Sequence, residues 1–337
     1  MPILFTISCS SEDTELPKDI YSFEKPENFP EPTYTFENNP VTKEGFELGR
    51  KLFFDPLLSR DNSISCNNCH QQSRAFADSP LHPTSIGIEN RMGTRNAPAL
   101  ANMAFLPEFF WDGGVTHLDF VPINAIESEV EMDNELANVI SKLNGHSEYP
   151  TLFQRTFGID SITSPFMLHA LSQFTNMMIS ANSPYDKYVR AEGSVLSTQE
   201  LEGLALFEAN CSECHSGELF SDFSYRNNGL NDSFTDLGRG CITESENDHG
   251  KFRVPSLRNS ELTAPYMHNA RFNTLEEVLD HYDNGIKDSP TLDPLFRDEE
   301  NVKGISLTDD EKTKIIAFIK TLTDREFTSN PIFRNNE

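Results

Sequence analysis

The stretch SCNNCHQQSRAFADSPLHPTSIGIEN, residues 65–90, begins with a Cys-x-x-Cys-His box made by Cys66, Cys69 and His70. This box is the attachment signature of c-type haem: two thiols form thioethers to the vinyl groups, and the adjacent imidazole binds the iron. A Cys-x-x-Cys pair alone can also bind zinc or act as a redox dithiol. A second box, CSECH, follows at Cys211, Cys214 and His215. Two boxes that each continue directly into histidine predict two covalently bound haem c groups.

The residues that precede the two boxes follow the same pattern. EGFELGRKLFFD (44–55) comes before the first box, and QELEGLALFEAN (199–210) before the second. Apolar residues recur in both at helical spacing. Ser197 and Glu200 add the pattern of a capping box at the start of the second helix. The chain therefore indicates an internal duplication, a helix followed by a haem box, twice.

Further helices are predicted where apolar residues recur every three or four positions, over 150–158, 164–180 and 307–322. In the last of these, Thr308 and Glu311 form another capping pattern. Strand patterns are almost absent. The sequence predicts a mainly α fold of two cytochrome c-like domains, each with one covalently bound haem c and long loops, including one over 221–250.

The stretch NSPYDKYVRAEGS, residues 182–194, is rich in turn formers and is a candidate connection between the two domains. We predict four segments on this basis. They are a signal and flexible tether over 1–35, an N-terminal haem domain over 36–190, a C-terminal haem domain over 191–322, and a tail over 323–337 that packs on the first domain.

The net charge of the chain limits the classes of partner that it can bind. The 337 residues include 53 acidic and 27 basic side chains, a formal net charge of -26. Such a chain is repelled by nucleic acid and by anionic membrane surfaces, whereas a basic protein partner is attracted. No run approaches the 18 or so apolar residues that a membrane-spanning helix needs.

The opening residues MPILFTISCSSEDTE resemble the end of a bacterial lipoprotein signal whose basic start is missing. In that interpretation Cys9 carries the lipid anchor, and residues from Ser10 to about Pro32 form a disordered tether. The alternative is a chance thiol in a flexible terminus. Cys241 belongs to neither box and is expected to be a free thiol.

The axial ligand opposite each box histidine decides whether a haem site carries electrons or reacts. An electron carrier needs both irons six-coordinate, usually by His/His or His/Met. Candidates after the first box are His82, Met92, Met103 and His117, and candidates after the second are Met267, His268, His281 and Tyr282. Spacing alone places none of them, although Met267 is the ordinary expectation for a single c-type unit.

Three longer motifs carry a resemblance to a known family. They are TSIGIENRMGTRNAPALANMAFLPEFFWDGG, ESEVEM and FRVPSLRNSELTAPYMHNARFNTLEEVLDHYDNG. In this order, from about Phe46 to Leu322, the chain resembles the bacterial dihaem cytochrome c peroxidase and MauG superfamily. The resemblance implies a periplasmic enzyme with two cytochrome c-like domains. Peroxide would react at the N-terminal haem, and the C-terminal haem would receive electrons from a small donor such as a monohaem cytochrome c or a cupredoxin.

The family resemblance also bears on the sixth ligand of the first haem. In many members a histidine after the TSIG turn binds the peroxidatic iron at rest, and here that position is Ile88. An aliphatic side chain cannot ligate iron, so the first haem is expected to be open unless His82 reaches it. Val121 stands where many relatives have a distal glutamine, which puts any amide contribution to peroxide binding in doubt.

Glu131, in SEVEM, matches the family's distal acid. Splitting the O–O bond needs a group that takes a proton from one oxygen and delivers it to the other, and a carboxylate can do both. The alternative is a solvated member of an acidic run. Trp111, the only tryptophan, matches the indole between the two haems, an electron relay; the alternative is an ordinary core aromatic.

Tyr282 occupies the position where other peroxidases carry the methionine ligand of the second haem, and MauG-like members have tyrosine there. A phenolate stabilises ferric iron and lowers its potential. The alternative is that Met267 is the ligand.

Asn96, Thr263 and Pro265 match the family's calcium site, where an amide and backbone carbonyls supply oxygen ligands. The surface tryptophan of MauG before the second box is replaced by Ala209 and Asn210, so that oxidation route is unsupported.

The sequence therefore predicts an oxidoreductase of the cytochrome-c peroxidase type that reduces hydrogen peroxide to water, with Glu131 and Trp111 as catalytic residues. One alternative is a MauG-like oxidase of a partner protein or small organic substrate. The other is a non-enzymatic dihaem electron carrier. The predicted location is the periplasm, with or without a lipid anchor at Cys9, and a homodimer is left open.

Overall fold

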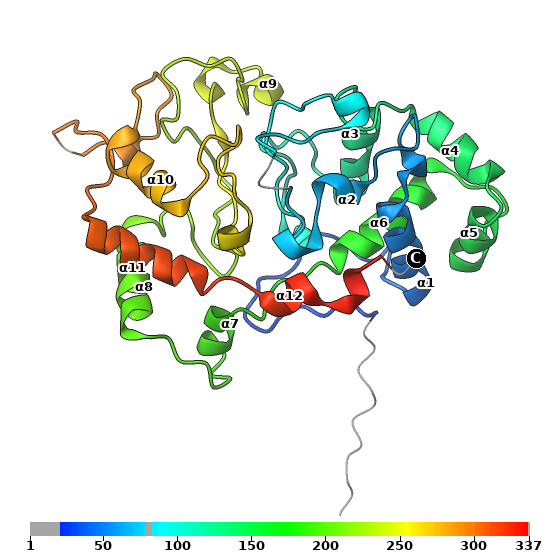
Figure 1. Ribbon diagram of the computed structural model, residues 1–337, viewed down its shortest axis with the longest axis horizontal. Helices are drawn as coiled ribbons and strands as arrows, with labels where there is room; N and C mark the ends of the chain where they lie inside the picture. The colour runs from blue at the N-terminus through cyan, green and yellow to red at the C-terminus, as the bar shows by residue number, and fades with distance from the viewer. Residues whose placement is uncertain (1–20, 79–81, 299, 336–337) are drawn as a thin grey trace, which may run out of the picture.

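The computed structural model describes residues 21–78, 82–298 and 300–335, and Cys9 lies outside them. The described chain is mainly helical, with a single two-stranded antiparallel sheet, so the predicted fold class is confirmed. Figure 1 shows two helical units side by side, joined at the base by the chain's last helix. Within the described ranges, no helix is both long and apolar enough to cross a membrane.

The helices of the first unit lie between Lys43 and Asn176. They are α1 (Lys43–Phe54), α2 (Cys66–Cys69), α3 (Val121–Glu127), α4 (Leu136–Gly145), α5 (Tyr149–Phe157) and α6 (Ser164–Asn176). The second unit contains α7 (Pro184–Val189), α8 (Thr198–Asn210), α9 (Gly240–Thr243), α10 (Leu275–Asp280) and α11 (Asp309–Lys320), with the short strands β1 (Tyr225–Arg226) and β2 (Phe252–Arg253). The final helix, α12 (Arg325–Ser329), returns to the first unit.

Each unit is built on one pair of closely packed helices. In the first unit α1 packs on α6, and a Cβ atom added to Gly49 would lie only 1.9 Å from the Ala170 carbonyl oxygen. In the second unit α8 packs on α11, and a Cβ at Gly203 would lie 2.0 Å from the Lys314 carbonyl oxygen. Both crossings thus require glycine on the helix that leads into a haem box, which gives the predicted duplication a physical basis.

Segments from both ends of the chain pack into the core of the first unit, and the N-terminal one differs from its expectation. Residues from Tyr21 to Tyr34 were expected within a flexible tether, yet Phe29 and Tyr34 are buried in the first hydrophobic core. Aromatic residues there remove apolar surface from water, which a solvated tether cannot do. Phe327 and Phe333 from the C-terminal tail are buried in the same core.

The connection over 182–194 is also more ordered than its turn-rich composition suggests. Ser183 caps α7, and its hydroxyl accepts from the Asp186 backbone N–H while the Asp186 carboxylate accepts from Ser183. The sequence Ser-Pro-x-Asp is therefore a helix start rather than a loop.

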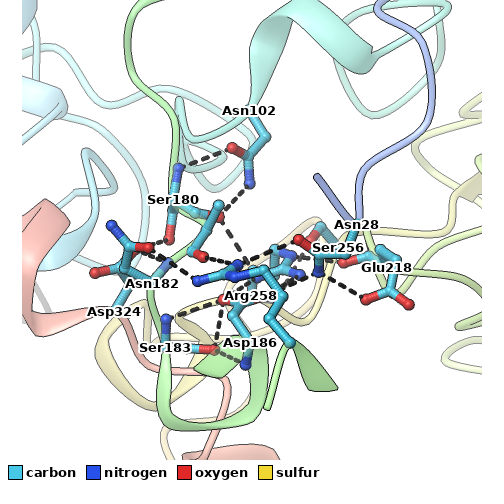
Figure 2. A network of polar contacts seen from close by, with 12 residues as sticks. Asn28, Asn102, Ser180, Asn182, Ser183, Asp186, Glu218, Ser256, Arg258 and Asp324 are labelled. Carbon is cyan, nitrogen blue, oxygen red and sulfur yellow. Dashed lines mark hydrogen bonds and ion pairs between the residues drawn. The ribbon is translucent and has the colours of Figure 1, made fainter. Parts of the chain in front are cut away.

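Asp186 is the centre of a buried polar network between the units, shown in Figure 2. Its carboxylate accepts two hydrogen bonds from the Arg258 guanidinium, at 2.9 and 2.8 Å, and both side chains are almost completely buried. Burial alone would raise the pKa of Asp186, but the bonds from Arg258 and Ser183 hold it below its ordinary value. Asp324, just before α12, reaches the same network through Ser180.

Candidate active site and electron-transfer site

The first box lies on α2, and its histidine is oriented by the turn that follows. His70 Nδ1 lies 2.8 Å from the Phe76 carbonyl oxygen. Because a carbonyl can only accept, Nδ1 carries the hydrogen, and Nε2 keeps its lone pair for an iron ligand bond. Ala75 and Phe76 have left-handed φ angles of 52° and 61°, which turn the chain so that this carbonyl faces back toward α2.

Glu131 lies close to this box. Its charge raises the pKa of both the Cys66 and the Cys69 thiol, although burial is the larger cause in each case. Burial also raises the pKa of Glu131 itself, against a hydrogen bond from Ser128 that lowers it. A carboxyl group with a raised pKa exchanges its proton more readily near neutral pH, as a proton shuttle requires.

The loop that carries Ile88 is fixed to the same segment. The Ile88 backbone N–H donates to the Glu131 carbonyl oxygen at 2.8 Å, and the Ile88 side chain is fully buried. A Cβ atom on Gly87 would lie 2.3 Å from the Val130 carbonyl oxygen and 2.4 Å from that of Glu131. Ile88 and Glu131 are therefore held together, with glycine permitting the contact.

The other candidate ligands of the first haem have other partners or surroundings. His82 Nδ1 lies 3.3 Å from Asp78 Oδ1. Met92 is half exposed and Met103 is buried in the first core. His117 lies beside Asp119, at 3.6 Å.

The second box repeats the geometry of the first. His215 Nδ1 lies 3.1 Å from the carbonyl oxygen of Phe220, which has a left-handed φ of 50°. His215, Cys211 and Cys214 line a largely apolar cavity. Tyr282, Met267 and Trp111 line the same cavity, although Trp111 comes from the first unit.

Tyr282 lies in a π-helical turn, His281–Gly285, that continues α10. Such turns change the direction of a side chain within a helix and are frequent at functional sites. The Tyr282 ring stacks on Phe296, with centroids 5.6 Å apart, and its carbonyl oxygen accepts from the Ile305 N–H at 2.7 Å. Burial raises the pKa of Tyr282, so a bound cation would be needed to favour the phenolate.

Asn228 contacts both candidate ligands of the second haem, and no sequence motif marked it. Its amide nitrogen lies 3.4 Å from the Met267 sulfur, and its side chain also hydrogen-bonds Tyr282, lowering the pKa that burial raises. His281 Nε2 is bonded to the Asn228 carbonyl oxygen at 3.0 Å. His268 stacks on Phe252, with ring centroids 3.5 Å apart.

Trp111 and Asn96 connect the two units. The Trp111 indole N–H donates to the Asn96 carbonyl oxygen at 2.8 Å, and the Asn96 backbone N–H donates to the His268 carbonyl oxygen at 2.8 Å. The Asn96 amide nitrogen lies 2.6 Å from the Pro265 carbonyl oxygen. The indole is therefore fixed against residues of the second unit.

The three predicted calcium ligands, Asn96, Thr263 and Pro265, all line the cavity of the second box. Rotating the Asn96 amide by 180° would turn its oxygen toward the Pro265 carbonyl, giving the hard, neutral oxygen donors that calcium accepts. Among the described residues, no group of three or more His, Cys, Asp or Glu side chains is arranged to hold a metal ion. Any calcium site here would depend on amide and carbonyl oxygens.

The residues of both boxes fit covalent haem. In each, two cysteines one helical turn apart precede a histidine whose Nδ1–H is already bonded to a carbonyl. The second box also lines a cavity whose other lining residues come from both units. Two cytochrome c-like units with one such box each define a dihaem c-type cytochrome.

Comparison with known proteins agrees with this class. The family model described as di-haem cytochrome c peroxidase matches residues 43–194. Methylamine utilization protein MauG of Methylophilus methylotrophus is 32% identical over 307 residues, covering 89% of this chain and 87% of that protein. Cytochrome c551 peroxidase of Nitrosomonas europaea is 33% identical over 291 residues, covering 84% and 81%.

A solved structure is similar over nearly its whole length. The crystal structure of a MauG-like protein associated with microbial copper homeostasis superposes with a TM-score of 0.85 at 31% identity, covering 94% of this chain and 99% of that one. The chain belongs to the dihaem cytochrome c peroxidase and MauG family. It is thus an oxidoreductase-family member with two c-type haem sites.

Proposed function

We propose that the protein is a dihaem peroxidase that reduces hydrogen peroxide to water at its first haem site. The overall reaction takes one peroxide, two electrons and two protons to two water molecules. The haem irons supply the redox chemistry when bound. The observation that carries the proposal is the pairing of Ile88, which is fully buried and cannot ligate iron, with the partly buried Glu131 on one fixed segment near Cys66 and Cys69.

Glu131 acts as the proton carrier. As a carboxylate it accepts a proton from one peroxide oxygen, and as the acid it returns that proton to the departing oxygen. The surrounding burial, which raises its pKa, brings the two forms closer in free energy near neutral pH. Ile88 keeps the neighbouring space apolar and contributes no ligand atom.

Cys211, Cys214, His215 and Tyr282 would hold the second haem, which would accept the electrons, and Trp111 is placed to relay them to the first site. The indole is suited to that role because it lines the second cavity while belonging to the first unit, and its N–H is fixed by Asn96. A calcium ion held by Asn96, Thr263 and Pro265 would stiffen this crossing. The periplasm is the compartment, and the net charge of -26 favours a basic donor protein.

A MauG-like oxidase is the second candidate, and Tyr282 is the observation that favours it. A phenolate ligand lowers the potential of the second haem site and disfavours its service as an electron acceptor from ordinary cytochromes. The oxidising power of peroxide would then be passed to a partner protein or a small organic substrate. The 31% identity to a MauG-like protein over 94% of the chain is consistent with this candidate.

The deciding experiment adds stoichiometric hydrogen peroxide to the all-ferric protein without reductant and follows both haems by optical and EPR spectroscopy. Reaction at rest supports an open first site, and subsequent catalytic turnover with a reduced cytochrome or cupredoxin supports the peroxidase. Loss of both ferric signals together, with poor turnover, favours the oxidase. Two low-spin, six-coordinate spectra and no reaction would refute both enzymes and indicate an electron carrier; reaction only after one-electron reduction would implicate His82.

A further inference from the structure

Arg253, in β2, is a buried cation with no carboxylate partner among the described residues. Its side chain is 9% exposed, and its guanidinium Nε donates to the Phe110 carbonyl oxygen at 3.2 Å. Burial lowers the pKa of Arg253, as expected for a charge removed from water. An unpaired buried charge is strongly unfavourable, so this residue needs an anion.

Glu108 is the carboxylate whose charge affects the pKa of Arg253, but it already has other partners. It accepts from the Tyr225 hydroxyl at 2.5 Å and pairs with Arg239 at 3.1 Å. Its charge reaches Arg253 only as a smaller effect on the pKa, behind that of Tyr225. The described chain therefore gives the remaining N–H groups of Arg253 no anionic acceptor.

Two other arginines that line the same cavity have the carboxylate partners that Arg253 lacks. Arg258 makes its bidentate pair with Asp186, and Arg226 pairs with Asp222 and Asp293 at 2.9 and 3.1 Å. Arg253 lines the cavity with them and has neither arrangement. Because a buried guanidinium normally forks onto a carboxylate, its partner is expected inside the cavity.

We infer that Arg253 binds a propionate carboxylate of the second haem. Haem c carries two propionates, which supply the missing acceptor in the cavity that Cys211, Cys214 and His215 line. The inference rests on that haem occupying this cavity, and it adds a recognition residue outside the box and the axial ligand.

The position of Arg253 also gives the contact a functional consequence. Its backbone N–H donates to the Trp111 carbonyl oxygen at 2.7 Å, and its side chain holds the preceding carbonyl, that of Phe110. The same residue thus links the edge of the second haem to the segment that carries the indole. A cation there favours the more negatively charged, reduced haem and raises its potential.

The test measures the reduction potential of each haem in the holoprotein, by spectroelectrochemistry over a range of pH, with Arg253→Gln. We expect a lower potential for the Tyr282 haem, an unchanged potential for the first haem, and a new pH dependence near neutrality. The pH dependence arises because a propionate without its guanidinium partner binds a proton more readily when the haem is reduced.

Arg226→Gln is the matched control, since it also removes one positive charge from the wall of the same cavity. It should lower the potential without adding a pH dependence, because it leaves the propionate contact intact. Equal, pH-independent shifts in the two variants would overturn the inference. Arg253→Lys, which keeps the charge, should restore most of the potential and serves as the readout if Arg253→Gln does not fold. Peroxide reaction at the first haem is measured separately, so failure of the proposed function would be distinguishable.

Discussion

His70 and His215 are held in the same way, each with Nδ1 bonded to a carbonyl in a left-handed turn, at 2.8 Å from Phe76 and 3.1 Å from Phe220. The other candidate residues of the two sites differ. Ile88 and the partly buried Glu131 lie near the first box, and Tyr282 with the Asn228 amide beside it lines the cavity of the second. The duplicated part is the haem-attachment geometry, and under the proposed function the non-repeated residues would separate a reacting site from an electron-entry site.

Removing the Glu131 carboxylate should have the largest effect on the difference between the two sites. We expect Glu131→Gln to lower peroxide turnover by about 10²- to 10⁴-fold, the range for loss of a general acid–base group. In the unchanged protein, turnover should fall as the pH drops through the raised pKa of Glu131, because the protonated acid cannot accept a proton from peroxide. The measurement is steady-state peroxide reduction with a reduced donor across pH.

Glu127→Gln is the control, since Glu127 is exposed and belongs to the same acidic run. It should leave both the rate and the pH profile unchanged. Equal losses in the two variants would show that the run acts through its overall charge, and Glu131 would then lose its assigned role.

The next largest effect concerns the join between the units. Asp186→Asn leaves the Arg258 charge buried and unpaired, and should destabilise the protein by about 3–5 kcal/mol. Because the folded pKa of Asp186 is depressed, its contribution is present above about pH 4 and is lost as the pH falls through the folded value. Chemical unfolding at several pH values, followed at both haems, would measure it.

Glu326→Gln provides the comparison, because it removes the exposed partner of Lys187 at the same join. Exposed ion pairs contribute little, so its unfolding curve should overlay that of the unchanged protein. If Asp186→Asn also has no effect, the buried network of Figure 2 does not stabilise the association of the two units.

The sequence was sufficient for the repeated parts of the molecule. The two boxes, the helices before them and the capping box at Thr308 and Glu311 follow from local rules, and the structure has them at those positions. Local rules also specify the mainly α fold class, because helical periodicity needs no knowledge of distant residues.

Long-range contacts explain what local patterns could not reveal. Phe29 looked like part of a tether until its partners in the first core were known. Asn228 belongs to no motif, and Arg253 lies in one that gave it no role. The partners of both come from segments more than 35 residues away, at Met267 and Phe110. A polar residue becomes informative only when the structure shows which partner it has and which it lacks.

Installing a ligand at the first site should make the two sites more alike. Ile88→His places an imidazole on the segment fixed to Glu131, and we expect the all-ferric protein to react with peroxide at least about tenfold more slowly, a barrier increase of roughly 1.4 kcal/mol or more. Reduction of the second haem by one electron should restore part of the rate. Stopped-flow mixing with peroxide, before and after reduction, measures both.

Ile88→Leu controls for disturbance of a fully buried position, because it changes shape without adding a ligand. It should react with peroxide at nearly the original rate. Slow reaction in both variants would mean that packing around Glu131, rather than ligation, limits access to the first site.

Exchanging the ligand at the second site should have the smallest effect of these substitutions. Axial-ligand identity sets haem potentials over roughly 0.8 V, and methionine raises them where a phenolate lowers them. We therefore expect Tyr282→Met to raise the potential of the second haem on the order of 0.1 V, and to improve electron entry from cytochrome donors.

Met267→Leu is the control, because it removes the competing sulfur that contacts Asn228, and it should leave the potential and spectrum unchanged. If Met267→Leu shifts the potential and Tyr282→Met does not, the second haem uses an ordinary His/Met pair. The asymmetry between the two sites would then rest on Ile88 and Glu131 alone, and the case for a MauG-like oxidase would lose its main support.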